Sequence, residues 1–156
     1  MSDQLLENLL HEARRFPPDA AITEGAVATA ELYERAAADP LGFWDSQARA
    51  LDWATGWTRT LDTDDTPFAR WFVGGTLNVA HNCVDRHVQA GRGDRIALHF
   101  EGEPGDSRDI SYTELRREVC RAANALTALG VSAGDRVAIY LPMIPEAVVA
   151  MLACAR

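Results

Sequence analysis

Four side chains on one expected helix carry groups that can bind a metal or act as a nucleophile and base. His81 and Asp85 lie four residues apart, as do Cys83 and His87, so each pair shares a helix face. A zinc site needs three or four such ligands, and nothing nearby in the sequence completes one. A nucleophilic pair of Cys83 and His87 lacks an orienting group and an oxyanion site. We therefore expect packing or hydrogen bonding here, with no metal site and no catalytic residue.

Two glycine-containing segments could be mistaken for phosphate-binding loops. They are Gly74-Gly75 and Gly91-Arg92-Gly93. A phosphate loop follows a strand, opens a helix and has a set glycine spacing, and neither segment meets these conditions. We expect turn and helix-cap roles for both, and no cofactor bound by this chain.

Large aromatic residues are concentrated in the first half of the chain. They could line a ligand pocket, but such side chains mostly fill cores, which favours packing. If Trp71 and Phe72 anchor the helical part to the hairpin that follows, Trp71→Ala should cost roughly 3–5 kcal/mol. Cys154 is expected to be a small buried hydrophobic residue. The aromatic set comprises Trp44, Trp53, Trp57, Phe68, Trp71 and Phe72.

The residue pattern divides the chain into residues 1–90 and residues 91–156. The first part is expected to be helical with irregular connections, including a polar loop at 62–65 and an Asn78-capped helix that Gly91 ends. The helix starting near Pro40 should carry Phe43, Trp44 and Leu51 inward. Earlier helices are expected around 5–10 and over 29–38.

After Gly91 the pattern alternates between strands and helices. A hairpin is expected from strands at 95–100 and 109–112, followed by a helix over 115–129 that is capped by Ser111 or Thr113 and closed by Gly130. The apolar run Val137–Leu141 is typical of a strand buried on both faces of a parallel sheet. Pro145 can open a last helix. The predicted fold class is α/β, a helical layer followed by hairpin, helix, strand and helix. The last helix carries no cap, so we expect the chain to be truncated.

Composition limits the function classes. The chain has 156 residues, 47% of them hydrophobic, and a net charge of -8. This is ordinary globular composition, and the acidic balance disfavours nucleic acids and anionic membranes as partners. Three widely spaced cysteines, no signal-peptide pattern and no long apolar run indicate a cytoplasmic protein.

The second part resembles the opening of the adenylate-forming superfamily. The shared motifs are Ile110–Leu115 (ISYTEL), Ala122–Leu126 (AANAL) and Leu129–Ile139 (LGVSAGDRVAI).

Other motifs resemble a narrower group, the short-chain acyl-CoA synthetases and above all the acetyl-CoA synthetases. This likeness covers Pro40–Arg156 and does not extend to residues 1–39. The motifs are Phe43-Trp44, Leu51–Trp53 (LDW), Trp71–Asn78 (WFVGGTLN), Asn82–His87 (NCVDRH), Glu101–Asp106 (EGEPGD), Tyr140–Glu146 (YLPMIPE) and Met151–Arg156 (MLACAR).

The resemblance implies a reaction for a longer parent protein. Such enzymes use ATP and Mg²⁺ to convert acetate to acetyl-AMP and pyrophosphate, and coenzyme A then takes the acetyl group. In the family, a Ser/Thr/Gly-rich phosphate loop ending in Lys-Gly and a lysine near the C-terminus lie downstream of the position of Arg156. The resemblance therefore implies a framework role for these residues and no activity for the chain alone.

Two other interpretations stay open. The parent could be a propionyl-CoA synthetase, because the acyl pocket is not in this part of the family pattern. The chain could instead be a stand-alone interaction module without catalysis. If the sheet is incomplete, its unpaired edge and uncovered apolar surface predict self-association, or loose order from about Pro142 onward.

Overall fold

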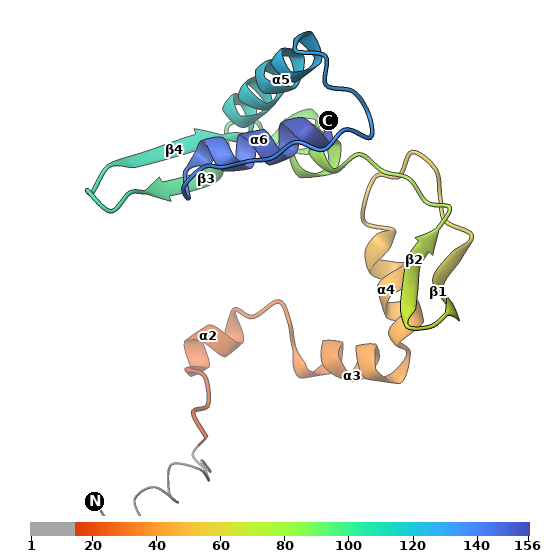
Figure 1. Ribbon diagram of the computed structural model, residues 1–156. Coiled ribbons are helices and arrows are strands. Elements are labelled where there is room, and N and C mark those ends of the chain that lie inside the picture. The colour runs from red at the N-terminus through yellow and green to blue at the C-terminus, as the bar shows by residue number, and fades with distance from the viewer. Residues whose placement is uncertain (1–14) are drawn as a thin grey trace, which may run out of the picture. The chain divides into compact units, whose positions relative to one another are not determined.

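The computed structural model of this protein describes residues 15–156. Contacts among these residues divide them into two units, the first ending at Phe43 and the second spanning Trp44–Arg156. The first unit contains helices α2 (Ala20–Glu24) and α3 (Ala30–Ala38) (Figure 1). Thr29 is the N-cap of α3 and Asp39 follows its last residue, which confirms the helix predicted over 29–38. The helix predicted around 5–10 lies outside the described residues.

Pro40 begins helix α4 (Pro40–Ala48), as expected from its fixed backbone angle. The side chain of Asp39 accepts a hydrogen bond of 3.0 Å from the backbone N–H of Gly42. The prediction that this region carries Trp44 and Leu51 inward is wrong, because Trp44 is 50% exposed and Leu51 is also exposed. Phe43, the third residue of that prediction, is half-buried, and the fully buried residue of α4 is Ala48.

A hairpin that is absent from the predicted elements lies in the first part of the chain. Strand β1 (Arg59–Asp65) pairs antiparallel with β2 (Phe68–Val73). The predicted polar loop at 62–65 is therefore wrong, since these residues belong to β1. Asp62 lies opposite Arg70 in the register, and this pairing of opposite charges lets an acidic run form a strand.

The helix predicted after Asn78 is present, although much of it is π-helical. Its two π-helical segments are η1 (His81–Asp85) and η2 (Val88–Arg92). The side chain of Asn78 accepts a hydrogen bond of 2.8 Å from the N–H of His81, which confirms the cap. Gly91 has φ 74°, a left-handed conformation that ends the regular helix.

The hairpin predicted from strands at 95–100 and 109–112 is confirmed, as are the helices after it. Strands β3 (Ile96–Glu101) and β4 (Ser107–Ser111) pair antiparallel and lead into α5 (Tyr112–Ala128), and Pro145 opens α6 (Pro145–Ala155) (Figure 1). Ser111, and not Thr113, caps α5 and forms a capping box with Glu114. These elements surround a buried core made of Val84, Ile110, Leu115 and Val119.

The apolar run Val137–Leu141 is not a strand, contrary to the prediction. It has no ladder partner, and all five residues lie in exposed, irregular backbone. A continuous apolar run becomes a buried strand only when neighbouring strands supply hydrogen bonds and helices cover its faces. Within residues 15–156 the strands form two separate antiparallel pairs, so no neighbouring strand supplies hydrogen bonds to this run. The fold is mixed, with helices and small antiparallel sheets. None of its described helices has the length and apolar character needed to cross a bilayer.

Candidate functional site

His81 and Asp85, the first predicted pair, serve different partners. The Nε2 atom of His81 lies 3.0 Å from a carboxylate oxygen of Asp52. Next to it, the buried side chain of Asn82 accepts a hydrogen bond from the N–H of Asp52 and donates one to its carbonyl, both 2.9 Å long. These contacts fasten the helix that begins at Asn78 to the loop that follows α4, which is a structural role.

Asp85 is the buried centre of an ion-pair network. Its carboxylate accepts hydrogen bonds of 2.8 and 3.3 Å from the guanidinium of Arg156, and the Nε of Arg116 lies 3.3 Å away. The hydrogen bond to Asp85 raises the pKa of Arg156. The network joins η1, α5 and the end of α6. Sequence spacing held no signal for it, because Arg116 and Arg156 are both far from Asp85 along the chain.

Cys83 and His87, the second predicted pair, are not joined by a hydrogen bond in the described chain. The Cys83 thiol is exposed. The Nδ1 of His87 lies 2.8 Å from a guanidinium nitrogen of Arg92, and the His87 ring packs on Tyr112 with 4.8 Å between ring centroids. Burial, followed by the charges of Arg92 and Arg86, lowers the pKa of His87. The geometry does not set up a thiol nucleophile with its base.

The positions of possible metal ligands are described for residues 15–156. In that range, no three side chains of His, Cys, Asp or Glu come together in a way that could hold a metal ion. We assign no metal ligand to these residues.

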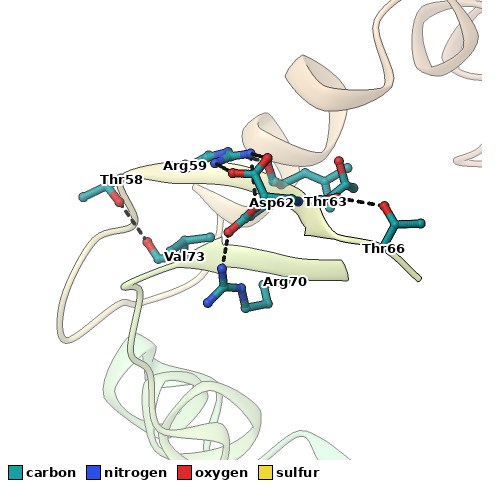
Figure 2. Close-up of polar contacts among 9 residues, drawn as sticks. Thr58, Arg59, Asp62, Thr63, Thr66, Arg70 and Val73 are labelled. Atoms are coloured by element: carbon teal, nitrogen blue, oxygen red, sulfur yellow. Dashed lines mark hydrogen bonds and ion pairs between the residues drawn. The ribbon is translucent and has the colours of Figure 1, made fainter. Parts of the chain in front are cut away.

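A second charged cluster lies on the hairpin β1–β2, and sequence reasoning missed it. Asp62 is 5% exposed and accepts from Arg70 across the strands at 2.5 Å (Figure 2). Arg59 lies 3.1 Å from the other oxygen of Asp62 and makes two 3.0 Å hydrogen bonds to Asp64. Because each carboxylate is matched by a guanidinium, the cluster stabilises the hairpin and leaves no free base for catalysis.

The aromatic set divides into a packed group and an exposed group. Trp53, Trp57 and Phe72 are partly buried, with ring centroids 4.9–5.6 Å apart, which fits the packing expectation. Trp44 and Trp71 form an edge-to-face pair at 6.5 Å in which both rings are about half exposed, and Phe68 is exposed. The predicted role of Trp71 as an anchor to the later hairpin is wrong, because its ring partners are Trp44 and Phe72.

The glycines of the two candidate loops have structural roles, and Cys154 has no assigned role. Gly74 and Gly91 have φ of 77° and 74°, as the expected turn and helix-end roles require. A Cβ on Gly75 would lie 2.6 Å from the Trp53 ring, so close packing requires glycine there. The prediction that Cys154 is buried is wrong, since it is exposed in α6.

Two family matches cover most of the chain. The acetyl-coenzyme A synthetase N-terminus family matches residues 29–83, and the AMP-binding enzyme family matches residues 84–156.

Curated relatives match over the whole chain or nearly so. An acetyl-coenzyme A synthetase of Streptomyces avermitilis is 68% identical over 156 residues, and one of Gemmatimonas aurantiaca is 57% identical over 157 residues, each alignment covering the entire chain and 24% of the relative. One of Mycolicibacterium smegmatis is 65% identical over 142 residues, which is 90% of the chain and 15% of the relative. The chain thus spans about a quarter or less of the length of these relatives.

Proposed function

Because the chain belongs to the acetyl-coenzyme A synthetase family, we propose that it forms the N-terminal portion of an AMP-forming acetate–CoA ligase. The observation that supports this most directly is the consecutive match of the two families over residues 29–83 and 84–156, at 68% identity to one relative. The parent enzyme would form acetyl-CoA from acetate, ATP and CoA through acetyl-AMP, in the cytoplasm.

In this proposal the chain supplies framework. Residues 1–90 form the N-terminal region, and residues 91–156 begin the AMP-binding large domain. Val137–Leu141 would become a central strand once neighbouring strands are present, since its apolar run is typical of a strand covered on both faces. The capped helix α5 and the Asp85 network would hold the hairpin β3–β4 against that sheet.

Mg²⁺ and the nucleotide belong to the parent in this proposal. A catalytic magnesium is usually held by one or two carboxylates together with substrate phosphates. The buried carboxylates of the described chain, Asp62 and Asp85, are already paired with arginines. These two residues therefore do not fit a magnesium site.

Acetate-dependent exchange of pyrophosphate into ATP tests the proposal. The 156-residue chain should show no exchange above a buffer blank, because adenylation needs groups that bind the triphosphate and stabilise developing charge. If the natural reading frame continues past Arg156, the longer protein that it encodes should show exchange. Acetate-dependent exchange by the purified chain, with host enzyme excluded, would contradict the framework role.

Substrate comparison separates the alternatives. A longer protein that prefers propionate to acetate would favour the propionyl-CoA synthetase interpretation. The interaction module would be favoured if the longer protein shows no exchange with either acid and has no downstream Ser/Thr/Gly-rich loop ending in Lys-Gly.

A further inference from the structure

A small cavity lies where the end of η2 and the start of β3 meet the N-terminus of α5. Its volume is about 350 Å³, and it is lined by His87, Arg92, Arg95, Ile96 and Tyr112. Three of these side chains carry N–H donors and a fourth carries a hydroxyl. The cavity is separate from both ion-pair networks described above.

Backbone contacts hold the walls of this cavity in place. The N–H of Tyr112 donates to the carbonyl of Arg95 at 3.0 Å, and that of Thr113 donates to the carbonyl of Gly93 at 2.9 Å. A Cβ on Gly93 would lie 2.5 Å from the hydroxyl of Thr113, so the loop approaches α5 as closely as glycine allows. Arg92 and Arg95 are therefore carried on a preorganised loop.

The two arginines have no carboxylate partner in the described part of the chain. Elsewhere in it, Arg59, Arg70, Arg108, Arg116 and Arg156 each lie within ion-pair distance of an aspartate or glutamate. Asp94, the carboxylate nearest in sequence, is exposed, and Glu114 in the first turn of α5 is engaged by the N–H and hydroxyl of Ser111 at 2.9 Å. In a chain of net charge -8, two arginines without a carboxylate partner in the described residues leave a local positive site on this cavity.

The contact between Arg92 and His87 sets the histidine tautomer. A guanidinium can only donate, so Nδ1 of His87 accepts the 2.8 Å hydrogen bond and Nε2 carries the proton. The positive charge of Arg86 also acts on His87. The cavity therefore combines two guanidinium groups, an imidazole N–H and the Tyr112 hydroxyl.

We propose that this cavity binds a small phosphate-bearing anion, with Arg92 and Arg95 as the charged donors and His87 and Tyr112 as further donors. Guanidinium groups suit phosphate because their planar N–H donors bind its oxygens in pairs. The size admits free phosphate or a small phosphate ester. The proposal does not depend on the parent's reaction, because it uses only residues of this chain.

Histidine NMR on the wild-type chain provides the first test. A bound anion stabilises the imidazolium, so inorganic phosphate should raise the pKa of His87 in a saturable way. His99, which is exposed on β3 beside Asp109 and does not line the cavity, is the internal control, and its signals should not respond. Sodium chloride at matched ionic strength controls for screening. Glycerol 3-phosphate in place of inorganic phosphate tells whether the site prefers the free ion or an ester.

Variants supply the second test. Arg92→Gln with Arg95→Gln should weaken phosphate binding by at least about tenfold, since each change removes a charge-assisted donor. Arg121→Gln, which removes an exposed arginine on α5 paired with Glu118, should bind as wild type. A wild-type response matched by chloride, shared by His99 or absent altogether would overturn the proposal, even if the double variant does not fold. A folded double variant that binds as wild type would also overturn it.

Discussion

At the scale of single residues, Phe72 shows how aromatic packing can hold a strained backbone. Its φ is 53°, a left-handed conformation that costs roughly 1–2 kcal/mol for a residue with a side chain. Its ring packs on Trp53 and Trp57, with centroid distances of 5.6 and 5.3 Å. These contacts therefore offset the strain and fix the end of β2.

Replacing Phe72 should cost more stability than replacing its neighbour Trp71. We expect Phe72→Ala to lower the free energy of unfolding by about 2–4 kcal/mol, because its packing is lost while the strained backbone stays. Trp71 is 46% exposed, so Trp71→Ala should cost only about 1–2 kcal/mol, less than the sequence alone predicts. Urea titration of both variants measures the difference. A larger loss for Trp71→Ala would show that its exposed ring has a packing role the structure does not reveal.

His87 should make stability depend on pH. Burial and the charges of Arg92 and Arg86 lower its pKa from the ordinary 6.5, so the unfolded chain takes up the proton at a higher pH than the folded chain. Its contribution to stability is therefore present above pH 6.5 and is lost as the pH falls through the folded-state pKa.

Denaturant midpoints at a series of pH values from about 8 down to about 5 test this expectation. The wild type should lose stability below about pH 6.5, and His87→Gln should lose less over the same interval. Gln89→Ala, which changes an exposed uncharged side chain of η2, is the control and should keep the wild-type profile. Parallel profiles for wild type and His87→Gln would contradict a lowered pKa.

At the scale of elements, the hairpin β1–β2 depends on one buried carboxylate. Asp62 lies between Arg59 and Arg70, and it also accepts a hydrogen bond of 3.0 Å from the N–H of Asp64. Asp64, by contrast, is 73% exposed although it pairs with Arg59. The two aspartates of one strand therefore form a matched test of burial.

Asp62→Asn should destabilise the hairpin by about 1–3 kcal/mol, because charge-assisted hydrogen bonds to a buried group are lost. Asp64→Asn should cost about 0–1 kcal/mol, the usual range for an exposed ion pair. Thermal or urea unfolding measures both, and amide exchange in β1 and β2 locates the loss. Equal effects of the two changes would show that burial of Asp62 adds nothing.

At the scale of the whole molecule, a large apolar surface is left exposed around α6. Val137, Ile139 and Leu141 are exposed together with Met143 and Met151. Part of this surface lines an open cavity of about 400 Å³ between α5, α6 and the segment before α6. Contiguous apolar surface of this kind favours association.

We expect the isolated chain to self-associate through this surface. Sedimentation velocity over a concentration series should show a rising weight-average coefficient, and Ile139→Lys should reduce it by placing a charge on the patch. Val27→Lys, which changes an apolar residue that is exposed outside the patch, is the control. A strictly monomeric chain with strong amide protection through 137–155 would contradict the prediction.

Local signals in the sequence were enough to predict several elements. Helix caps and backbone preferences act within one helical turn and need no distant partner. The residues that act in this way are Ser111 with Glu114, Asn78, Pro145 and Gly130. The alternation of strand and turn residues between 95 and 112 predicted the second hairpin for the same reason. The family motifs likewise depend only on the order of residues along the chain, so tertiary contacts are not needed to recognise them.

Tertiary structure decided the features that depend on contacts between distant residues. The acidic run 62–65 forms a strand because Arg70 lies opposite Asp62, and no local pattern reveals that register. Leu129 continues the apolar stripe of α5 and is still 81% exposed, while Leu115 on the same stripe is buried against Val84 and Ile110. Val137–Leu141 has the composition of a central strand but no neighbouring strand to pair with in the described chain. The residue pattern indicates which side chains gain stability from burial. Only the tertiary neighbours decide whether they are buried, because ladder hydrogen bonds and apolar contacts need a second element to supply them.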